Sequence, residues 1–353
     1  MGSIHKAAYT LLAAISVLAL AGCSSGASSG MASGPAPEQR TIVVDEVPTA
    51  DEAGLYIALD NGYFTQQGLN VILHTVDGGE LGIPDLQDGK AQLLVGNYVS
   101  FILAQIAGEF ALTPGTPEKP FNVRIIADGS QMQPGNQAIY VLPGSKFKTL
   151  ADLVKYHAKV GLNSANNIGQ VLFGSLFQEN GLNFNKGVVQ VYEPFPNLLT
   201  DLASGKIAAA WLPEPFATIA EQAFGAVPLA DFDQGSLQNF PIGAYIGTTQ
   251  WVQSHPNTVA AFLRALNEGQ QVADSNRAAV EQGVVQNTKH LGQAATTPLQ
   301  AATMTIDTYP LTMDVPVMQR VSDAMFEFGL EKGFKQPYNI MNMIQPEPGM
   351  IGG

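Results

Sequence analysis

Short runs of β-branched and other apolar residues alternate with helix-like segments along most of this 353-residue chain. The first run, Thr41–Val47, is followed by Ala53–Gly68, in which Leu55, Tyr56 and Leu59 recur at helical spacing. A strand followed by a helix usually pairs in parallel with the next strand, because the helix carries the chain back across the sheet. The alternation therefore predicts an α/β fold of mostly parallel sheets flanked by helices.

The rhythm recurs in a second set of segments, without a sequence repeat of fixed period. Further strands are predicted over Leu69–Val76, Gln92–Gly96, Asn122–Asp128, Ala138–Leu142, Lys159–Leu162, Val188–Tyr192, Ile207–Leu212 and Ala226–Leu229. Further helices are predicted over Gly82–Gly89, Tyr98–Gly108, Leu150–His157, Ile168–Gly181, Asn197–Gly205 and Pro215–Phe224. From Asn257 onward the chain turns predominantly helical, over Thr258–Ser275, Arg277–Leu291, Pro298–Ile306 and Pro316–Gly329.

Composition excludes several kinds of protein. A formal net charge of −13 repels phosphate backbones, so nucleic acid is not a predicted partner. Cys23 is the single cysteine of the sequence, which rules out an internal disulfide and a thiolate metal cluster. The five histidines are scattered, with no pair at metal-ligand spacing. We therefore expect no metal and no cofactor.

The N-terminus carries an export signal. Lys6 ends a short positive stretch, and Ala7–Leu20 is apolar but too short to span a membrane comfortably. The sequence Leu20-Ala21-Gly22-Cys23 that follows resembles the lipobox of prokaryotic lipoproteins. The resemblance implies that residues 1–22 are a signal peptide and that Cys23 is lipidated. Residues 23–40, rich in Ser, Gly, Ala and Pro, then form a flexible tether. The predicted location is the extracytoplasmic face of the cell membrane, anchored only by lipid.

Ligands of open α/β sheets bind beyond the carboxyl ends of the strands, near helix N-termini. The loops that follow predicted strands are therefore the candidate ligand-binding segments. They are residues 48–52, 97–100, 129–131, 163–167, 193–194 and 211–215.

Five segments carry short motifs in a fixed order. They are Ala53–Val71 (with AGLYIA, NGYF and QGLNV), Leu86–Gln92, Thr149–Leu153, Leu202–Pro215 and Trp251–Ala265. In this order they resemble the nitrate/sulfonate/taurine-binding and thiamine-precursor (pyrimidine) binding proteins of ABC importers. Two positions depart from the family pattern: Gln92 replaces the usual Asp, and Val154-Lys155-Tyr156 replaces a customary Lys-Gly-Lys.

The resemblance implies a two-lobed, hinged periplasmic-binding-protein type II architecture. Lobe one would comprise residues 41–130 plus 243–353, and lobe two residues 131–242. The chain would cross between lobes near Gly129–Gln137 and Phe240–Tyr245. A ligand would close the lobes like a hinge, and an ABC permease with its ATPase would recognise the closed form of this monomer.

The predicted ligand-binding residues come from these loops and from the second crossing segment. They are Thr49, Asp51, Glu52, Asn97, Tyr98, Ser100, Ser130, Asn163, Ser164, Asn166, Glu193, Trp211, Glu214 and Tyr245. Several of these residues could instead have a purely structural role. Ser164 and Asn166 are good helix caps, and Trp211, Tyr98 and Tyr245 are suited to a core.

The acidic members of this set bear on the ligand. Asp51, Glu52, Glu193 and Glu214 lie in loops that contain no Arg or Lys. A buried carboxylate without a partner is costly, so each of these groups is expected to be solvated, hydrogen-bonded to the backbone, or paired with the ligand. The last alternative implies a ligand with N–H donors or positive charge, such as an amine or aminopyrimidine. The alternative is a sulfonate-like ligand held by the neutral Ser and Asn side chains.

An enzyme is not predicted, because the sequence contains no Gly-x-Ser-x-Gly elbow, phosphate-binding glycine loop or metal-ligand spacing. It also lacks the cysteine-rich motif of a eukaryotic branch that resembles this family and makes the thiamine pyrimidine. A ligand-sensing or scaffolding lipoprotein without a transport partner is the alternative function, and the sequence does not separate it from an importer component.

Overall fold

The structure is a computed structural model, which describes residues 34–111 and 121–344. The predicted signal peptide, the predicted lipidation site Cys23 and most of the predicted tether lie outside the described residues.

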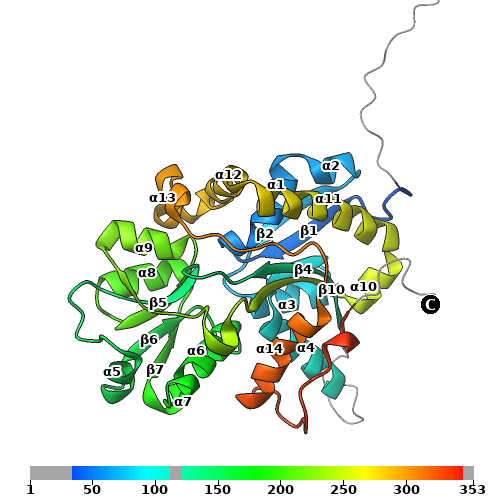
Figure 1. Ribbon diagram of the computed structural model, residues 1–353. Coiled ribbons are helices and arrows are strands. Elements are labelled where there is room, and N and C mark those ends of the chain that lie inside the picture. The colour runs from blue at the N-terminus through cyan, green and yellow to red at the C-terminus, as the bar shows by residue number, and fades with distance from the viewer. Residues whose placement is uncertain (1–33, 112–120, 345–353) are drawn as a thin grey trace, which may run out of the picture. The chain divides into compact units, whose positions relative to one another are not determined.

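Two five-stranded sheets form the centres of two lobes (Figure 1). The first sheet has the order β2-β1-β3-β10-β4. Its strands are β1 (Thr41–Glu46), β2 (Asn70–Thr75), β3 (Leu93–Asn97), β4 (Val123–Gln131) and β10 (Pro241–Thr248). The second sheet has the order β7-β6-β8-β5-β9. Its strands are β5 (Gln137–Val141), β6 (Lys159–Leu162), β7 (Val189–Tyr192), β8 (Ala209–Pro213) and β9 (Val227–Asp231). The predicted α/β, two-lobed architecture is confirmed.

Each sheet is mixed, and the two share one topology. Strand β1 pairs in parallel with β2 and β3, whereas β10 runs antiparallel to both β3 and β4. In the second sheet β6 pairs in parallel with β7 and β8, whereas β5 runs antiparallel to β8 and β9. One antiparallel strand is thus inserted next to the last strand of each sheet, and the other four strands of each sheet run in one direction.

Strand β10 is absent from the sequence prediction, which treated Phe240–Tyr245 as a crossing segment. It is buried along nearly its whole length, so it shows no alternation of apolar and polar residues. Gly243 and Gly247 also interrupt its apolar run. Gly243 lies against Gly129 of β4, where a Cβ on Gly129 would come within 2.8 Å of the Gly243 carbonyl carbon. Close pairing of the two strands therefore requires a glycine at position 129. The glycines within β10 weaken its strand signal, so its composition does not predict a strand.

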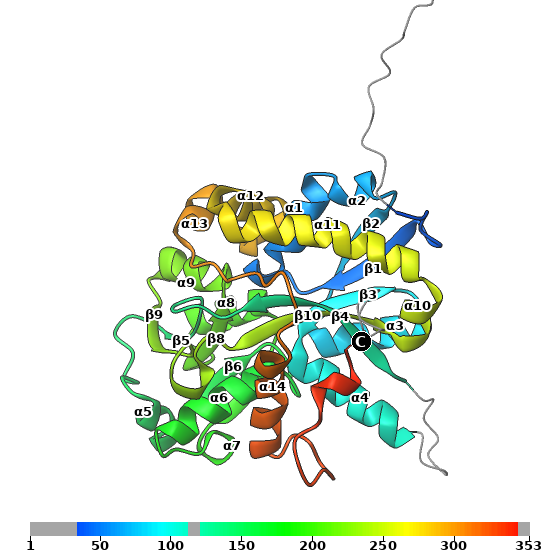
Figure 2. The same ribbon diagram turned by 45° about the vertical axis from the view of Figure 1, so that its right-hand side comes forward.

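Helices cover both faces of the first sheet (Figures 1 and 2). One face carries α1 (Ala53–Asp60), α2 (Tyr63–Gln66), α11 (Pro256–Ser275) and α12 (Arg277–Asn287). The other face carries α3 (Gly79–Asp88), α4 (Tyr98–Ala111) and α14 (Val315–Glu327). Alternate residues of each strand supply the two cores. Val95 of β3 belongs to the cluster with Leu55 of α1 and Phe262 of α11, and its neighbour Leu94 to the cluster with Leu86 and Ile102.

The second sheet lies between α8 (Phe195–Ala203) and α9 (Phe216–Phe224) on one side and α5 (Leu150–Lys155), α6 (Ile168–Glu179) and α7 (Phe184–Gly187) on the other (Figure 1). The short helices α10 (Thr249–Ser254) and α13 (Pro298–Thr303) complete the set, with 3-10 turns at Ala50–Glu52, Gly235–Leu237, Lys289–Ala294 and Ile340–Asn342.

The helix predicted over Ala53–Gly68 is two helices. Gly62 has a φ of 73°, a left-handed conformation that ends α1 and starts α2. Other helices begin where the sequence offers a cap. The Thr149 hydroxyl accepts from the Asp152 amide at 3.2 Å, and the Asp152 carboxylate accepts from the Thr149 amide at 3.0 Å. No helix in the described residues is long and apolar enough to cross a membrane.

The C-terminal segment contacts both lobes. Helix α13 packs on α9 of the second lobe, and α14 packs on α4 and α6. Between them, Thr308 pairs with Gln131 at the end of β4, and the Tyr309 hydroxyl donates to the Ala50 carbonyl at 2.9 Å. Residues 304–309 therefore run along the junction between the lobes (Figure 2). From here on, the term crossing segment means these residues, and not the crossings predicted near Gly129–Gln137 and Phe240–Tyr245.

Helices α1 and α11 approach closely because both have a glycine at the contact. A Cβ on Gly269 would lie 2.1 Å from the Gly54 carbonyl oxygen, which is backbone and has little freedom to move. We expect Gly269→Ala to lower the free energy of unfolding by about 1–3 kcal/mol, measured by urea denaturation.

Gly283→Ala is the matched control. Gly283 also lies in a helix that faces α1, but its Cβ would meet Tyr56 at 3.3 Å. A change within about 1 kcal/mol is expected, since the gain in helix propensity offsets the tighter contact. Equal losses in both variants would refute the proposed contact between α1 and α11.

Candidate functional site

A cavity lies where the strand-end loops of the two lobes meet. The first lobe contributes Val47, Thr49, Asp51, Glu52, Gly96, Asn97, Ile242 and Gly243. The second lobe contributes Asn163, Asn167, Ile168, Phe195, Trp211 and Pro213. Residues Ile242 and Gly243 reach this edge because β10 is antiparallel, so its first residues lie beside the carboxyl ends of the parallel strands.

Hydrogen bonds between the lobes surround the cavity. The Asn163 side-chain amide donates to the Asp77 carbonyl at 3.1 Å, and the Ala50 amide donates to the Glu214 carbonyl at 2.9 Å. The Gln137 amide also reaches Asp51 Oδ1 at 3.3 Å. The space open to the centre of a water molecule is about 30 Å³. That is room for about two waters, so the lobes are in a closed arrangement.

One wall of the cavity is aromatic. Trp211 packs edge-on against Phe195, with ring centroids 5.3 Å apart, and its indole N–H donates to Gln137 Oε1 at 3.0 Å. The indole also lies against Gly169, where a Cβ would approach within 2.7 Å. Trp211 is only 3% exposed, so it belongs to the core of the second lobe as well as to the cavity wall.

Two acceptors in the wall have no hydrogen-bond partner. Glu52 is 2% exposed, and its Oε2 is buried without a donor. Asn163 Nδ2 is held by the Asp77 carbonyl, which leaves the buried Asn163 Oδ1 without a donor. These two oxygens come from different lobes, and both residues line the cavity. Buried acceptors of this kind are rare unless a ligand or an ordered water supplies the donor.

Asp51 and Asp307 form a hydrogen-bonded carboxyl pair beside the cavity. Asp51 also accepts from the Thr49 hydroxyl at 2.8 Å, and Asp307 accepts from the Asn136 side chain. Burial is the largest cause that raises the pKa of each carboxyl, and for Asp307 the neighbouring Asp51 charge raises it further. Two carboxylates in contact cannot both be ionised cheaply, so their proximity favours the protonated form of one of them.

Glu52 is in a similar environment. Burial, followed by the nearby charges of Asp51 and Glu46, raises the pKa of Glu52 well above its usual value. Among the described residues, no ion pair involves Asp51, Glu52 or Asp307. None of the described lining residues is Lys, Arg or His. The described wall therefore contains carboxyl groups and no basic side chain to neutralise them.

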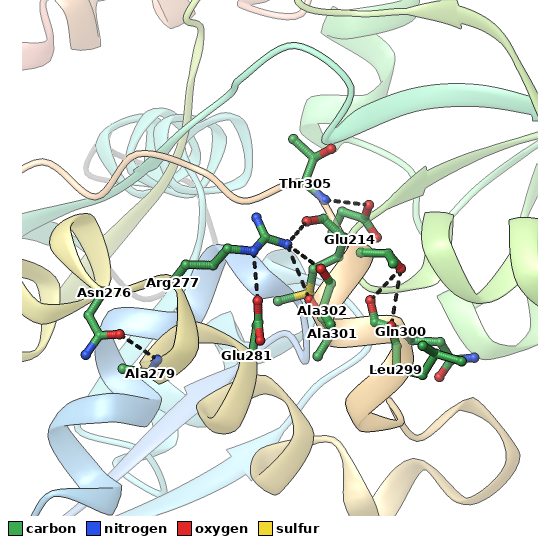
Figure 3. A network of polar contacts seen from close by, with 12 residues as sticks. Glu214, Asn276, Arg277, Ala279, Glu281, Leu299, Gln300, Ala301, Ala302 and Thr305 are labelled. Atoms are coloured by element: carbon green, nitrogen blue, oxygen red, sulfur yellow. Dashed lines mark hydrogen bonds and ion pairs between the residues drawn. The ribbon is translucent and has the colours of Figure 1, made fainter.

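Glu214, a predicted ligand-binding residue, instead joins the second lobe to the crossing segment (Figure 3). Its carboxyl group accepts from the Thr218 amide at 3.0 Å, the Thr218 hydroxyl at 2.9 Å and the Thr305 amide at 3.1 Å. Next to it, Arg277 donates to the carbonyls that end α13, including Ala302 at 3.2 Å, and pairs with Glu281 at 2.7 Å. Burial raises the pKa of Glu214 to about 7.

The structure divides the predicted site residues into two groups. Six line the cavity: Thr49, Asp51, Glu52, Asn97, Asn163 and Trp211. The others are not lining residues of this closed cavity: Tyr98, Ser100, Ser130, Ser164, Asn166, Glu193, Glu214 and Tyr245.

Several of that second group have evident structural partners. The Tyr98 hydroxyl donates to Asp128 at 2.8 Å, and Tyr245 packs in the core beneath α11. Ser164 accepts from Asn167 at 2.9 Å, and Glu193 pairs with Lys206 at 3.8 Å. The Ser100 hydroxyl donates to the Asn166 carbonyl at 3.4 Å.

The lining residues that the prediction omitted are mostly apolar. They are Val47, Gly96, Asn167, Ile168, Phe195, Pro213, Ile242 and Gly243. Asn167 and Pro213 lie inside predicted loops, and Val47, Gly96, Ile168 and Phe195 lie directly next to one. A prediction that took every residue of these loops and their apolar neighbours would therefore have included all six. Ile242 and Gly243 lie in Phe240–Tyr245, which the family resemblance had marked as a crossing between the lobes. Asp307 reaches the junction through residues 304–309, and no local signal in the sequence marks it.

A possible set of metal ligands is present elsewhere. Asp45, His74 and Asp85 have ligand atoms within 4.8 Å of one another. The sequence prediction of no metal site relied on spacing, and these residues meet only because β1 and β2 pair Asp45 with His74. His74 bonds Asp45 at 3.0 Å and Lys90 pairs with Asp85 at 3.0 Å, so side chains already provide partners for both carboxylates.

The fold, with its cavity at the junction of two lobes, defines the class: a two-lobed α/β protein with the periplasmic-binding-protein fold. Residues 35–287 match the NMT1-like family, and the chain belongs to it. The family resemblance predicted from the sequence motifs is thereby confirmed. No curated protein sequence matches the chain.

Solved structures share the fold at low identity. The alkanesulfonate-binding protein SsuA of Xanthomonas axonopodis pv. citri, bound to MOPS, superposes with a TM-score of 0.70 at 14% identity, over 87% of this chain and 99% of that one. The periplasmic nitrate-binding protein NrtA of Synechocystis PCC 6803 gives 0.60 at 18% identity, over 71% and 66%. The Candida albicans CA3427 product, described as having the generic periplasmic binding protein fold, gives 0.65 at 13%, over 87% and 96%.

The raised pKa of Glu214 predicts how stability depends on pH. The folded state binds this proton more tightly than the unfolded state, whose pKa is near 4.5. Its contribution is therefore fully present below about pH 4.5 and is lost as the pH rises through about 7. We expect Tm to fall by a few degrees between about pH 5.5 and about pH 8, and Glu214→Gln to show a smaller fall.

Glu193→Gln is the control for this experiment, since Glu193 does not take part in the buried hydrogen bonds of Glu214. It should keep the pH dependence of the unchanged protein. A profile for Glu214→Gln as steep as that of the unchanged protein would show that the buried Glu214 proton does not contribute.

Proposed function

We propose that this protein is the extracytoplasmic solute-binding component of an ABC importer. It captures a small polar molecule in the cavity between its lobes and delivers it to a permease and ATPase. The observation that carries the proposal is the cavity itself, which is lined by both lobes and has in its wall, from each lobe, one residue with an unpartnered buried oxygen. Family membership and the fold shared with SsuA and NrtA support it.

Capture requires the lobes to separate and close. Two connections between the sheets, residues 132–136 and 232–240, provide the hinge. The closed cavity of about 30 Å³ is far smaller than the several hundred Å³ of ordinary ligand pockets, so a ligand enters an open form. Each hydrogen bond between the lobes contributes only about 0.5–1.5 kcal/mol, so ligand bonds to both lobes shift the balance toward closure.

The lining chemistry favours a ligand that donates hydrogen bonds. Glu52 Oε2 and Asn163 Oδ1 are both acceptors without donors, and Asp51 adds a second carboxyl group to the wall. A sulfonate or nitrate group would bring more acceptors to these oxygens and would supply no donor to them. An amine or an aminopyrimidine supplies N–H donors, and its apolar part can pack against Trp211 and Phe195.

The protein acts at the membrane surface through a lipid on Cys23. The apolar run Ala7–Leu20 and the Leu20–Cys23 motif support export and acylation, and residues 23–40 supply the tether. Several acyl chains would hold the monomer durably next to its permease, where one chain would bind only marginally.

Binding can be tested with thermal shift and calorimetry on the purified protein, using amines, aminopyrimidines, alkanesulfonates and nitrate. We expect saturable binding of N–H donor ligands, with a gain in stability of about 2.7 kcal/mol at 100 times the Kd. Glu52→Gln should weaken binding about tenfold or more, because it removes a charge-assisted hydrogen bond. Glu193→Gln, outside the cavity, should bind within about twofold of the unchanged protein.

Two results would count against this proposal in different ways. No binding across the whole panel would refute solute capture at the cavity. Tight binding of a sulfonate or nitrate that is insensitive to Glu52→Gln would leave solute capture intact and refute the ligand class.

Lipid anchoring is tested by Cys23→Ser in a bacterial host. The exported variant should move from the membrane fraction to the soluble extracytoplasmic fraction, and metabolic labelling with palmitate should be lost. Ser24→Ala is a matched control that should keep both. A Cys23→Ser protein that remains with the membrane and incorporates label would overturn the assignment.

A further inference from the structure

Three carboxyl groups meet at the lobe junction in an environment without positive charge. Asp51 and Asp307 are hydrogen-bonded to each other, and Glu52 is the next residue along the chain. Glu52 is 2% exposed and Asp307 is 5% exposed. We call Asp51, Glu52 and Asp307 the junction carboxyls. Two of them, Asp51 and Glu52, line the cavity.

The titratable groups that face the junction carboxyls are acids or phenols. Glu46 of β1 acts on Glu52, and Glu214 of the second lobe acts on Asp307. The phenols of Tyr245 and Tyr309 lie within electrostatic range of the same carboxyls. Among the described residues none of the three forms an ion pair with a lysine, arginine or histidine.

Hydrogen bonds to these carboxyls leave a free acceptor at the cavity. Both oxygens of Asp51 have partners, with Thr49 donating to Oδ2 and Gln137 to Oδ1, in addition to the bond with Asp307. Glu52 Oε2, by contrast, is buried with no donor. A buried carboxylate with no donor and no counter-charge is unstable, so such a group keeps its proton until a positive charge arrives.

We infer that the junction carboxyls hold a proton when the site is empty, and that a ligand with a positively charged nitrogen releases this proton on binding. The inference rests on the proposed function and names both the ligand's charge and its coupling. The exchange balances: the ligand brings one positive charge, one carboxyl O–H ionises, and its proton passes to solvent. The net charge of the closed junction is therefore unchanged.

Exchange of this kind gives binding a defined pH dependence. Higher pH helps remove the proton, so affinity for a cation rises with pH, by up to about tenfold per pH unit for one released proton. A neutral or anionic ligand has no charge to replace the proton. Its affinity is expected to stay constant or to fall as the pH rises.

Benzamidine, benzamide and benzenesulfonate provide a test with matched shape and different charge. Benzamidine stays cationic across the range used. With the purified protein we expect its Kd to fall as the pH rises from about 6 to about 8, by up to about tenfold per pH unit. A pH electrode in weakly buffered salt solution should record close to one proton released for each benzamidine bound. Benzamide should release none.

Two substitutions identify which junction carboxyl releases the proton. Asp307→Asn keeps the shape of the side chain and its contact with Asn136, and Glu52→Gln keeps that of Glu52, but neither new group can ionise. We expect the proton release and the slope of log Kd against pH to be lost in one of these variants or in the double variant. Glu193→Gln should keep both. Circular dichroism establishes that each variant is folded.

The outcomes are separable. Benzamidine binding with a flat pH dependence and no proton release overturns this inference and leaves solute capture standing. Preferential binding of benzenesulfonate overturns the ligand's positive charge and again leaves capture standing. If none of the three compounds, nor the amines and sulfonates of the wider panel, binds at any pH, solute capture itself fails.

Discussion

Carboxyl groups without counter-cations determine the chemistry of the junction between the two lobes. Asp51, Glu52 and Asp307 are buried or partly buried there, and proton sharing and hydrogen bonds take the place of lysine or arginine. Removing charge from water costs several kcal/mol per ion unless it is paired, so these groups persist only as neutral acids or beside a cation. The closed form is therefore suited to a positively charged or hydrogen-bond-donating occupant.

Polar groups at the junction also link the crossing segment to the loops around the cavity. Glu214 joins the start of α9 to residue 305, Asp307 bonds both Asp51 and Asn136, and the Tyr309 hydroxyl holds the Ala50 carbonyl. The crossing segment thus contacts loops from both lobes next to the ligand site. A change in the charge of the cavity would alter the electrostatic energy of these contacts. Closure of the lobes and ligand binding therefore share a physical basis.

Shared fold does not imply shared ligand. SsuA and NrtA, described as alkanesulfonate- and nitrate-binding, have the same architecture at 14–18% identity. In this chain, the described residues of the cavity wall include two carboxyl groups and three Asn side chains, and none of them is basic. The fold brings strand-end loops of two lobes together, and the side chains on those loops decide the ligand.

The sequence determined the elements and the kind of fold. Alternating strands and helices, such as Thr41–Val47 followed by Ala53–Gly68, predicted two α/β lobes, because this periodicity is a local property of the chain. The loops that follow predicted strands also include Thr49, Asn97, Asn163 and Trp211, which line one cavity in the structure. Only the tertiary structure decided what depends on distant contacts. Strand β10 has no periodic signal because it is buried on both faces, and Asp307 reaches Asp51 from 256 positions away along the chain. Whether a carboxyl such as Glu214 binds a ligand or an amide is likewise fixed by the neighbours that folding brings to it, and a sequence does not record them.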